Sequence, residues 1–160
     1  MSSSFCAVRR LQLLLSVAFA AVLLGGCSEA VEQQASYESI VDSKQMMNWI
    51  LDPNADVIWG SAGTITTFEG VEDLTPTTQE GWDAVRNAAA TLAEAGNLLK
   101  IPGHSQGEDW NEISGGLTRT AVRLIEAAEQ KDGQAVFDYG GQLYNVCVSC
   151  HQLYMLPEDE

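Results

Sequence analysis

The stretch Cys147-Val148-Ser149-Cys150-His151, near the end of the chain, decides how this sequence is interpreted. Two thiols three positions apart are followed directly by an imidazole. On an α-helix this spacing brings all three side chains to one face. The pattern C-x-x-C-H is typical of c-type haem attachment, in which the thiols form thioethers with the haem vinyl groups and the histidine binds the iron. We therefore expect one covalently attached haem c, with Cys147 and Cys150 as the attachment points and His151 as the proximal iron ligand.

Two other chemistries use the same residue types. A thioredoxin-like redox pair also has the C-x-x-C spacing, but it belongs to a βαβ context that this sequence lacks. A structural zinc site needs two further ligands, and the only other histidine is His104. Both alternatives stay open, and haem attachment is favoured.

The beginning of the chain has the pattern of an export signal. Arg9 and Arg10 precede an apolar run from Leu11 to Leu24, which is short for a membrane span. The run ends in Leu24-Gly25-Gly26-Cys27, which resembles the lipobox of bacterial lipoproteins. An ordinary signal peptide with a chance cysteine is the alternative.

The lipobox interpretation divides the chain into three parts. Residues 1–26 form a lipoprotein signal peptide, residues 27–36 a tether attached to lipid at Cys27, and residues 37–156 a folded domain. The protein would then be anchored on the periplasmic side of a bacterial membrane, and Ser28 favours the outer membrane. The cysteine usage agrees, because Cys6 leaves with the signal and no thiol remains for a disulfide.

The composition describes an acidic, globular chain. Removal of Arg9 and Arg10 with the signal leaves six basic and 22 acidic residues, a formal net charge of −16. Such a surface repels nucleic acid and anionic lipid headgroups and favours a partner protein with a basic docking face. Solubility alone also accounts for many of these charges.

Helical periodicity follows the tether. Apolar residues continue at helical spacing from Tyr37 to Phe68, with a break at Asp52-Pro53, and predict a long kinked helix over 37–69. The threonine-rich segment 64–68 is instead compatible with a short strand. We expect residues 71–76 to form a loop.

Three more helices are expected in the remainder. One runs from a cap at Thr77 or Thr78 to about Lys100, with a capping-box pattern between Thr77 and Glu80. The second runs from about Gly107 to Lys131, and the last follows Asp132-Gly133 and carries the C-x-x-C-H motif. Four amphipathic helices predict an all-α fold, an antiparallel four-helix bundle with the covalent haem near the C-terminal helix.

The second axial position of the iron has to be filled from another helix. Met155 lies one turn beyond His151 on the same helix and hence on the wrong side of the iron. In the first helix, Met47 shares the face of Ile40 and Leu51, whereas Met46 points outward near Trp49. We therefore predict Met47 as the distal ligand and Met46 as the second choice. The alternative is that both methionines only fill space in the hydrophobic core. We expect His104, in a glycine-rich loop, to be solvated.

Two smaller motifs need interpretation. The segment Gly103-His104-Ser105-Gln106-Gly107 matches the G-x-S-x-G nucleophile elbow of esterases, but no strand is expected before it, so we interpret it as a turn between helices. Gly140 and Gly141 lie within the last helix, where glycine is unfavourable. They indicate either room for the porphyrin ring, a close helix crossing, or a tolerated weakness.

Together these features resemble the cytochrome c-prime superfamily, four-helix bundles that carry C-x-x-C-H on the last helix and a distal residue on the first. The resemblance covers nearly all of residues 37–156. It implies covalent haem at Cys147 and Cys150, proximal ligation by His151, and Met47 in the position of the sixth ligand of methionine-ligated members. Tyr154 matches a common aromatic residue, whereas Met155 replaces the usual basic residue. Such bundles often form homodimers, and a homodimer is left open here.

The predicted function is electron transfer. A mono-haem c-type cytochrome with His/Met ligation would carry single electrons by Fe(III)/Fe(II) cycling, as a carrier and not an enzyme. The alternative is a five-coordinate haem protein that binds or senses a small gas such as NO or CO. A non-haem structural or metal-binding lipoprotein is the third hypothesis.

Overall fold

The computed structural model describes residues 37–155. These residues are mostly helical and include one small sheet of two strands. The predicted all-α class is therefore confirmed in its coarser form, with a β-hairpin added. The expected signal peptide, the tether and the lipidation site at Cys27 lie outside the described residues. In the described part of the chain, no helix is long and apolar enough to cross a membrane.

The N-terminal helix consists of three consecutive segments. They are α2 (Ser43–Met46), a π-helical turn η1 (Met47–Leu51) and α3 (Asp52–Trp59). A capping box starts the helix: the Gln45 N–H donates to the Asp42 carboxylate at 2.7 Å, and the Asp42 N–H donates to the Gln45 side chain at 3.0 Å.

This helix is shorter than predicted. It ends at Trp59, and the chain then forms a hairpin of β1 (Thr64–Thr67) and β2 (Gly70–Asp73), paired antiparallel with Thr64 opposite Asp73. The prediction of one helix over 37–69 is therefore wrong, as is the predicted loop over β2, whereas the alternative of a strand at 64–68 is confirmed. Gly63 has φ +90°, a conformation that glycine adopts readily, and it turns the chain out of the helical path.

The other helices agree closely with their predicted ranges. They are α4 (Gln79–Leu98), α5 (Glu108–Gln130) and α6 (Gly133–Tyr154). The Thr78 hydroxyl accepts the Gly81 N–H at 3.1 Å, so Thr78 is the cap and the expected capping box between Thr77 and Glu80 is wrong. The Asp132 carboxylate caps α6 by accepting the Ala135 N–H at 3.0 Å.

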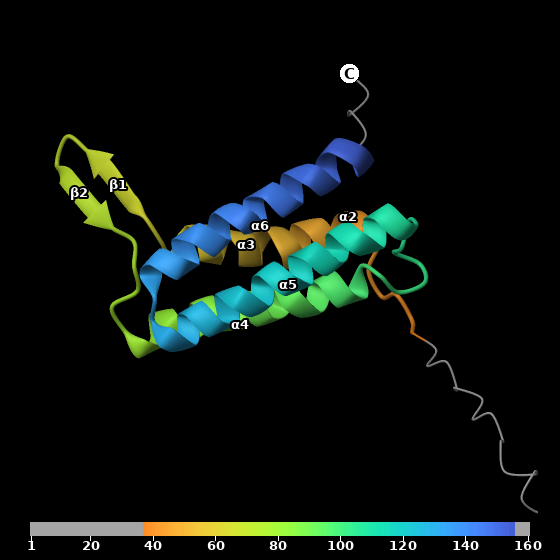
Figure 1. The fold of residues 1–160 in the computed structure, drawn as a ribbon, viewed down its shortest axis with the longest axis horizontal. Helices are drawn as coiled ribbons and strands as arrows, with labels where there is room; N and C mark the ends of the chain where they lie inside the picture. Colours follow the sequence, from red (N-terminus) through yellow and green to blue (C-terminus); the bar gives the residue numbers. More distant parts are fainter. Residues whose placement is uncertain (1–36, 156–160) are drawn as a thin grey trace, which may run out of the picture. The chain divides into compact units, whose positions relative to one another are not determined.

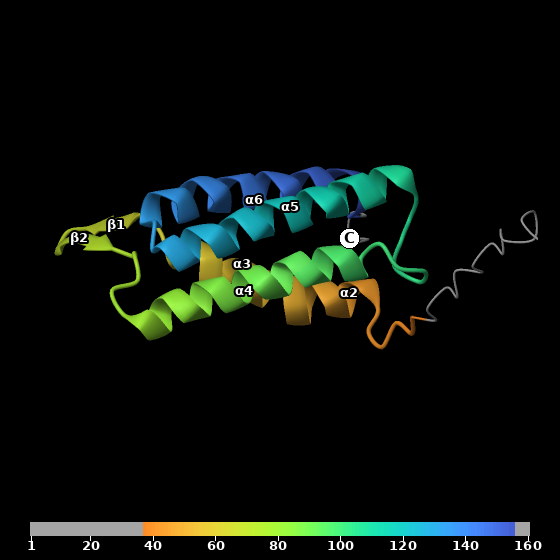
Figure 2. The same ribbon diagram turned by 60° about the horizontal axis from the view of Figure 1, so that its bottom comes forward.

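The helices enclose a common core. The helix α4 packs along α5, α5 packs along α6, and α3 packs against both α4 and α6. Two views show consecutive helices running in opposite directions, with the hairpin projecting from one end (Figure 1, Figure 2). Between the helices lie fully buried side chains from each of them, including Ile58, Leu92, Val85, Leu124, Leu143 and Val136.

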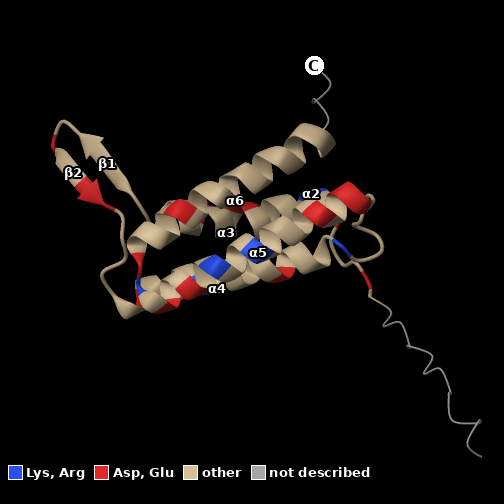
Figure 3. Ribbon diagram, in the orientation of Figure 1, with Lys and Arg blue, Asp and Glu red and all other residues tan. Residues whose placement is uncertain are grey.

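One stripe of α6 faces this core. Val136, Gly140 and Leu143 are buried in it, and Cys147, Cys150 and Tyr154 continue it at alternating spacings of three and four residues. Asp138 is the one Asp, Glu, Lys or Arg residue of this helix, so most of α6 is drawn tan in Figure 3. The C-terminal half of α6 therefore presents an uncharged surface around the C-x-x-C-H motif.

Candidate functional site

The C-x-x-C-H motif occupies the end of α6. Cys147 and Cys150 are half-buried at the edge of the core and are free thiols, while His151 is exposed. Because all three side chains belong to two adjacent turns of one helix, their order along the helix is fixed by the backbone. Both thiols therefore pack against the core, and the imidazole faces solvent.

A hollow of about 370 Å³ lies beside the motif. Cys147 and His151 both line it, while Cys150 does not. Its walls are mainly aromatic and aliphatic, and its full lining is Trp59, Tyr144, Cys147, Val148, His151, Gln152 and Met155. The hollow is open to solvent, and its mostly apolar lining with a few polar groups is compatible with contact to a cofactor or other small molecule.

Trp59, which lines this hollow, joins the N-terminal helix to α6. Its indole Nε1 donates a hydrogen bond to the Gly140 carbonyl oxygen at 3.0 Å. Its ring meets the Tyr144 ring edge to face, with 6.0 Å between the ring centres. A Cβ on Gly140 would lie 3.5 Å from Ile58 and 3.6 Å from Trp59, so Gly140 stands at a close helix crossing. Of the alternatives predicted for the two glycines, a close helix crossing therefore applies to Gly140. Gly141 has open space around it.

The electrostatics of the two cysteines oppose ionisation. Burial raises the pKa of the Cys147 thiol, and the nearby Cys150 and the Asp52 carboxylate raise that pKa further. Burial also raises the pKa of the Cys150 thiol. Reactive redox cysteines have lowered pKa values, often at a helix N-terminus, whereas these cysteines lie near the C-terminus of α6. The arrangement therefore disfavours the thioredoxin-like alternative.

The zinc alternative needs a closed set of four ligands. Within residues 37–155, no group of three or more His, Cys, Asp or Glu side chains is arranged to hold a metal ion. His104, the only other histidine, belongs to the connection between α4 and α5 rather than to the hollow. The described residues therefore offer no protein-only metal centre around the motif.

Of the two candidate distal ligands, Met46 lies elsewhere than expected. Met46 is 2% exposed and is part of the core, so the prediction that it points outward is wrong. Met47, the first residue of the π turn, is half-buried at the edge of the core and does not line the hollow. Met155 lines the hollow at the C-terminal end of α6. Cys147, His151 and Met155 line the hollow together, and Met47 is not among its lining residues.

His104 is buried rather than solvated, which corrects the prediction. It is 3% exposed, and its Nε2 lies 2.7 Å from the hydroxyl oxygen of Ser39. Its Nδ1 has no hydrogen-bond partner. The N-terminal segment before α2 covers this histidine, a long-range contact that local sequence cannot reveal. The G-x-S-x-G segment that contains His104 lies between α4 and α5, as the turn interpretation requires.

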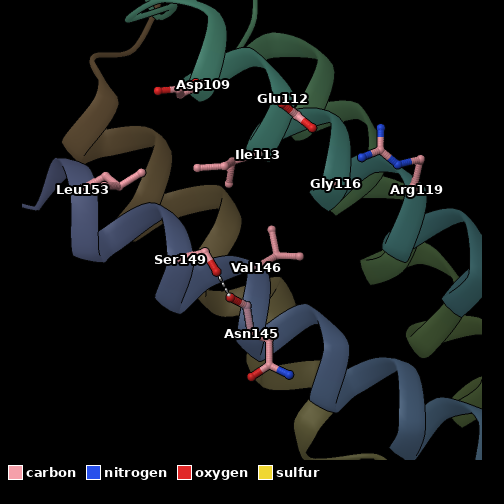
Figure 4. A pocket seen from close by; sticks show the side chains of 9 residues that line it. All are labelled: Asp109, Glu112, Ile113, Gly116, Arg119, Asn145, Val146, Ser149 and Leu153. Atoms are coloured by element: carbon pink, nitrogen blue, oxygen red, sulfur yellow. Dashed lines mark hydrogen bonds between the residues drawn. The ribbon is translucent and has the colours of Figure 1, made fainter.

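A second hollow, of about 430 Å³, lies between α5 and α6 (Figure 4). Ser149 is the only residue of the C-x-x-C-H motif that lines it, and its hydroxyl donates to the Asn145 carbonyl oxygen at 2.7 Å. Asp109 and Glu112 line one end of the hollow, and Arg119 lies further along α5. Since no thiol or imidazole reaches it, this hollow is separate from the candidate site.

Trp59 and Tyr144 line the hollow, although neither is predicted as a site residue. Tyr144, Val148, His151 and Met155 recur at spacings of four and three residues, and this helical period predicts that they share one side of the last helix with Cys147. Trp59 is brought there by the packing of α3 on α6, for which the sequence has no comparable signal.

Comparisons of the chain with protein-family models, with curated proteins and with solved structures found no match.

Proposed function

We propose that this protein is a mono-haem c-type cytochrome that carries single electrons. The observation that carries the proposal is the placement of Cys147, Cys150 and His151 on adjacent turns of α6, with Cys147 and His151 lining an apolar hollow. The two thiols are free, are spaced for attachment to the two vinyl groups of one haem, and lie in a surface without charged neighbours on α6. A redox pair or a zinc centre does not account for these three features together.

The helix arrangement supports the matching fold. Successive helices run in opposite directions and pack in the order α3, α4, α5 and α6, with α6 returning to α3. We infer an antiparallel four-helix bundle and propose membership of the cytochrome c-prime superfamily, in which the attachment motif lies on the last helix. Ridges of α6 packed on α5 and α3 would hold the motif rigidly.

Each residue of the site has a task in this proposal. Cys147 and Cys150 would hold the haem covalently, and His151 would bind the iron through an imidazole nitrogen. When bound, the haem would supply one-electron Fe(III)/Fe(II) exchange. Trp59, Tyr144 and Val148 would cover the haem with apolar surface and exclude water from it. Apolar cover and exclusion of water both tune the reduction potential of a haem. We propose that Met47 would be the second protein ligand of the iron, and that Met46 is less suited because it is buried in the core.

The cellular setting is part of the proposal. Lipidation at Cys27, anchorage on the periplasmic side and removal of residues 1–26 rest on the sequence alone. The acidic residues at the start of α5, Glu108, Asp109 and Glu112, lie at the same end of the molecule as the end of α6 (Figure 3). A partner with a basic docking face would be attracted to this end by long-range electrostatics.

The optical spectrum of the protein, exported together with a haem-attachment system, tests this function. We expect a low-spin ferric spectrum with a methionine-to-iron charge-transfer band, and reversible one-electron reduction. The alternative, a gas-binding haem protein, would give a high-spin five-coordinate spectrum that shifts on addition of CO. A protein without haem absorption would contradict both.

A further inference from the structure

The contacts between the N-terminal helix and α6 fix how the two helices are aligned. Trp59 bonds to the backbone of Gly140. Two helical turns further along each helix, in opposite directions, lie Asp52 and Cys147, and the Asp52 carboxylate is close enough to Cys147 to act on its thiol by charge. These two points align α3 antiparallel to α6.

The π turn changes which residue lies one helical turn before Asp52. The Asp52 N–H donates to the Met47 carbonyl, so η1 closes with an i→i+5 bond where an α-helix would bond Asp52 to Asn48. One turn before Asp52 therefore lies Met47. One turn after Cys147 lies His151. Continued by one turn, the alignment of the two helices would set the half-buried Met47 at the level of His151, while Asn48 is exposed.

Pro53 accounts for the π turn. Proline has no N–H, so Pro53 cannot donate to the Trp49 carbonyl, and its ring crowds that carbonyl in a regular α-helix. An extra residue in the turn relieves the crowding. The Asn54 side-chain amide donates to the Ile50 carbonyl at 2.6 Å and so satisfies a carbonyl next to the widened turn. Proline and its neighbour together account for a π turn where the intrinsic preference is for an α turn.

We propose that Pro53 is a positioning residue for the distal iron ligand. By imposing the π turn, it sets Met47 rather than Asn48 opposite His151. This inference rests on the proposed haem function and adds to it the cause of the ligand's placement. The position of the thioether would then be a property of the backbone, and it would move to residue 48 if the turn became α-helical.

The test uses the full-length holoprotein and four variants. Met47→Ala should lose the ferric methionine-to-iron charge-transfer band, and so should Pro53→Ala, because an α turn would bring Asn48 into the ligand position. The double variant Pro53→Ala/Asn48→Met should regain the band. The matched control Asn48→Met, with the π turn intact, should keep the parent spectrum. Covalent haem should be retained in all four, which shows that each variant has matured, and an unchanged far-UV circular dichroism spectrum should show that each has folded.

The outcomes distinguish failure of the role of Pro53 from failure of the proposed haem function. A parent protein that carries no covalent haem would overturn the proposed function. A parent with haem and the band, whose Pro53→Ala variant keeps that band, would overturn only the role of Pro53. A band that survives Met47→Ala would overturn the assignment of Met47 and the inference with it, while haem attachment would stand.

Discussion

The indole Nε1 of Trp59 donates a hydrogen bond to the backbone carbonyl oxygen of Gly140, at a distance of 3.0 Å. This bond joins the end of the N-terminal helix to the middle of α6, two turns before Cys147. It therefore holds together the two helices between which the candidate site lies.

Replacing Trp59 with Phe should lower the free energy of unfolding by about 1 kcal/mol, because the aromatic packing is largely kept and the hydrogen bond is lost. Urea unfolding measures the change. Trp49→Phe is the matched control, since Trp49 is exposed and should shift stability by less than about 0.5 kcal/mol. Equal effects of the two substitutions would contradict the role of the Trp59 bond.

Two glycines within helices should respond in opposite ways to replacement with alanine. A Cβ on Gly96 would collide with the Thr118 hydroxyl and lie 2.9 Å from the Ser114 carbonyl oxygen, so Gly96→Ala should destabilise the protein by about 1–3 kcal/mol. Gly141 has open space around it, and Gly141→Ala should stabilise α6 by up to about 1 kcal/mol. Thermal unfolding of the two variants, in the same preparation, checks the sign of each change.

The thiols of the chain before haem attachment should be slow to alkylate. Burial raises the pKa of both cysteines, and Cys150 raises that of Cys147 further, so less thiolate is present at pH 8 than in a free peptide. Cys150→Ser should lower the pKa of Cys147 and speed its reaction with iodoacetamide. An alkylation rate equal to that of an unfolded peptide would contradict the burial of these thiols.

The same shift has a consequence for stability against pH. The folded pKa of each thiol lies above its unfolded value, so the folded chain holds its thiol protons more firmly. The thiols' contribution is therefore fully present below the unfolded pKa, about 8.5, and is lost as pH rises through the folded pKa. Urea unfolding of the haem-free chain should show this alkaline loss, and a Cys147→Ser/Cys150→Ser variant should show less of it.

Salt should slow electron exchange with a basic redox protein. The chain is strongly acidic, and attraction between opposite charges is screened at higher ionic strength. Stopped-flow reduction by a basic cytochrome should therefore slow as salt is added, whereas reduction by a small neutral reagent should not. A rate with the basic partner that is independent of salt would contradict an electrostatic docking face.

The three long helices could be predicted from the sequence because each carries a sustained apolar stripe and a recognisable end. Thr78 and Asp132 are side-chain caps, and both act as such. The apolar spacing predicts too long an N-terminal helix because Ile65 and Phe68 happen to continue it. In the structure both are exposed on the hairpin, beyond the turn that Gly63 makes.

The methionines show a limit of periodicity arguments. A constant period of 3.6 residues puts Met47 on the core face and Met46 outside, but the π turn adds a residue and shifts the phase. Met46 is therefore buried and Met47 lies at the core's edge. The burial of His104 cannot be predicted from local sequence for another reason: Ser39, which contacts it, is distant in sequence and is brought to it by the fold. The motif on α6 is local and needed no such information.

The mass of the intact protein, purified after export with a haem-attachment system and measured under denaturing conditions, tests the central claim most directly. The account predicts a mass equal to the processed polypeptide plus one haem, lost in the Cys147→Ser/Cys150→Ser variant, with the haem located on the peptide that contains His151. A mass equal to the polypeptide alone, with both thiols free to react, would contradict it.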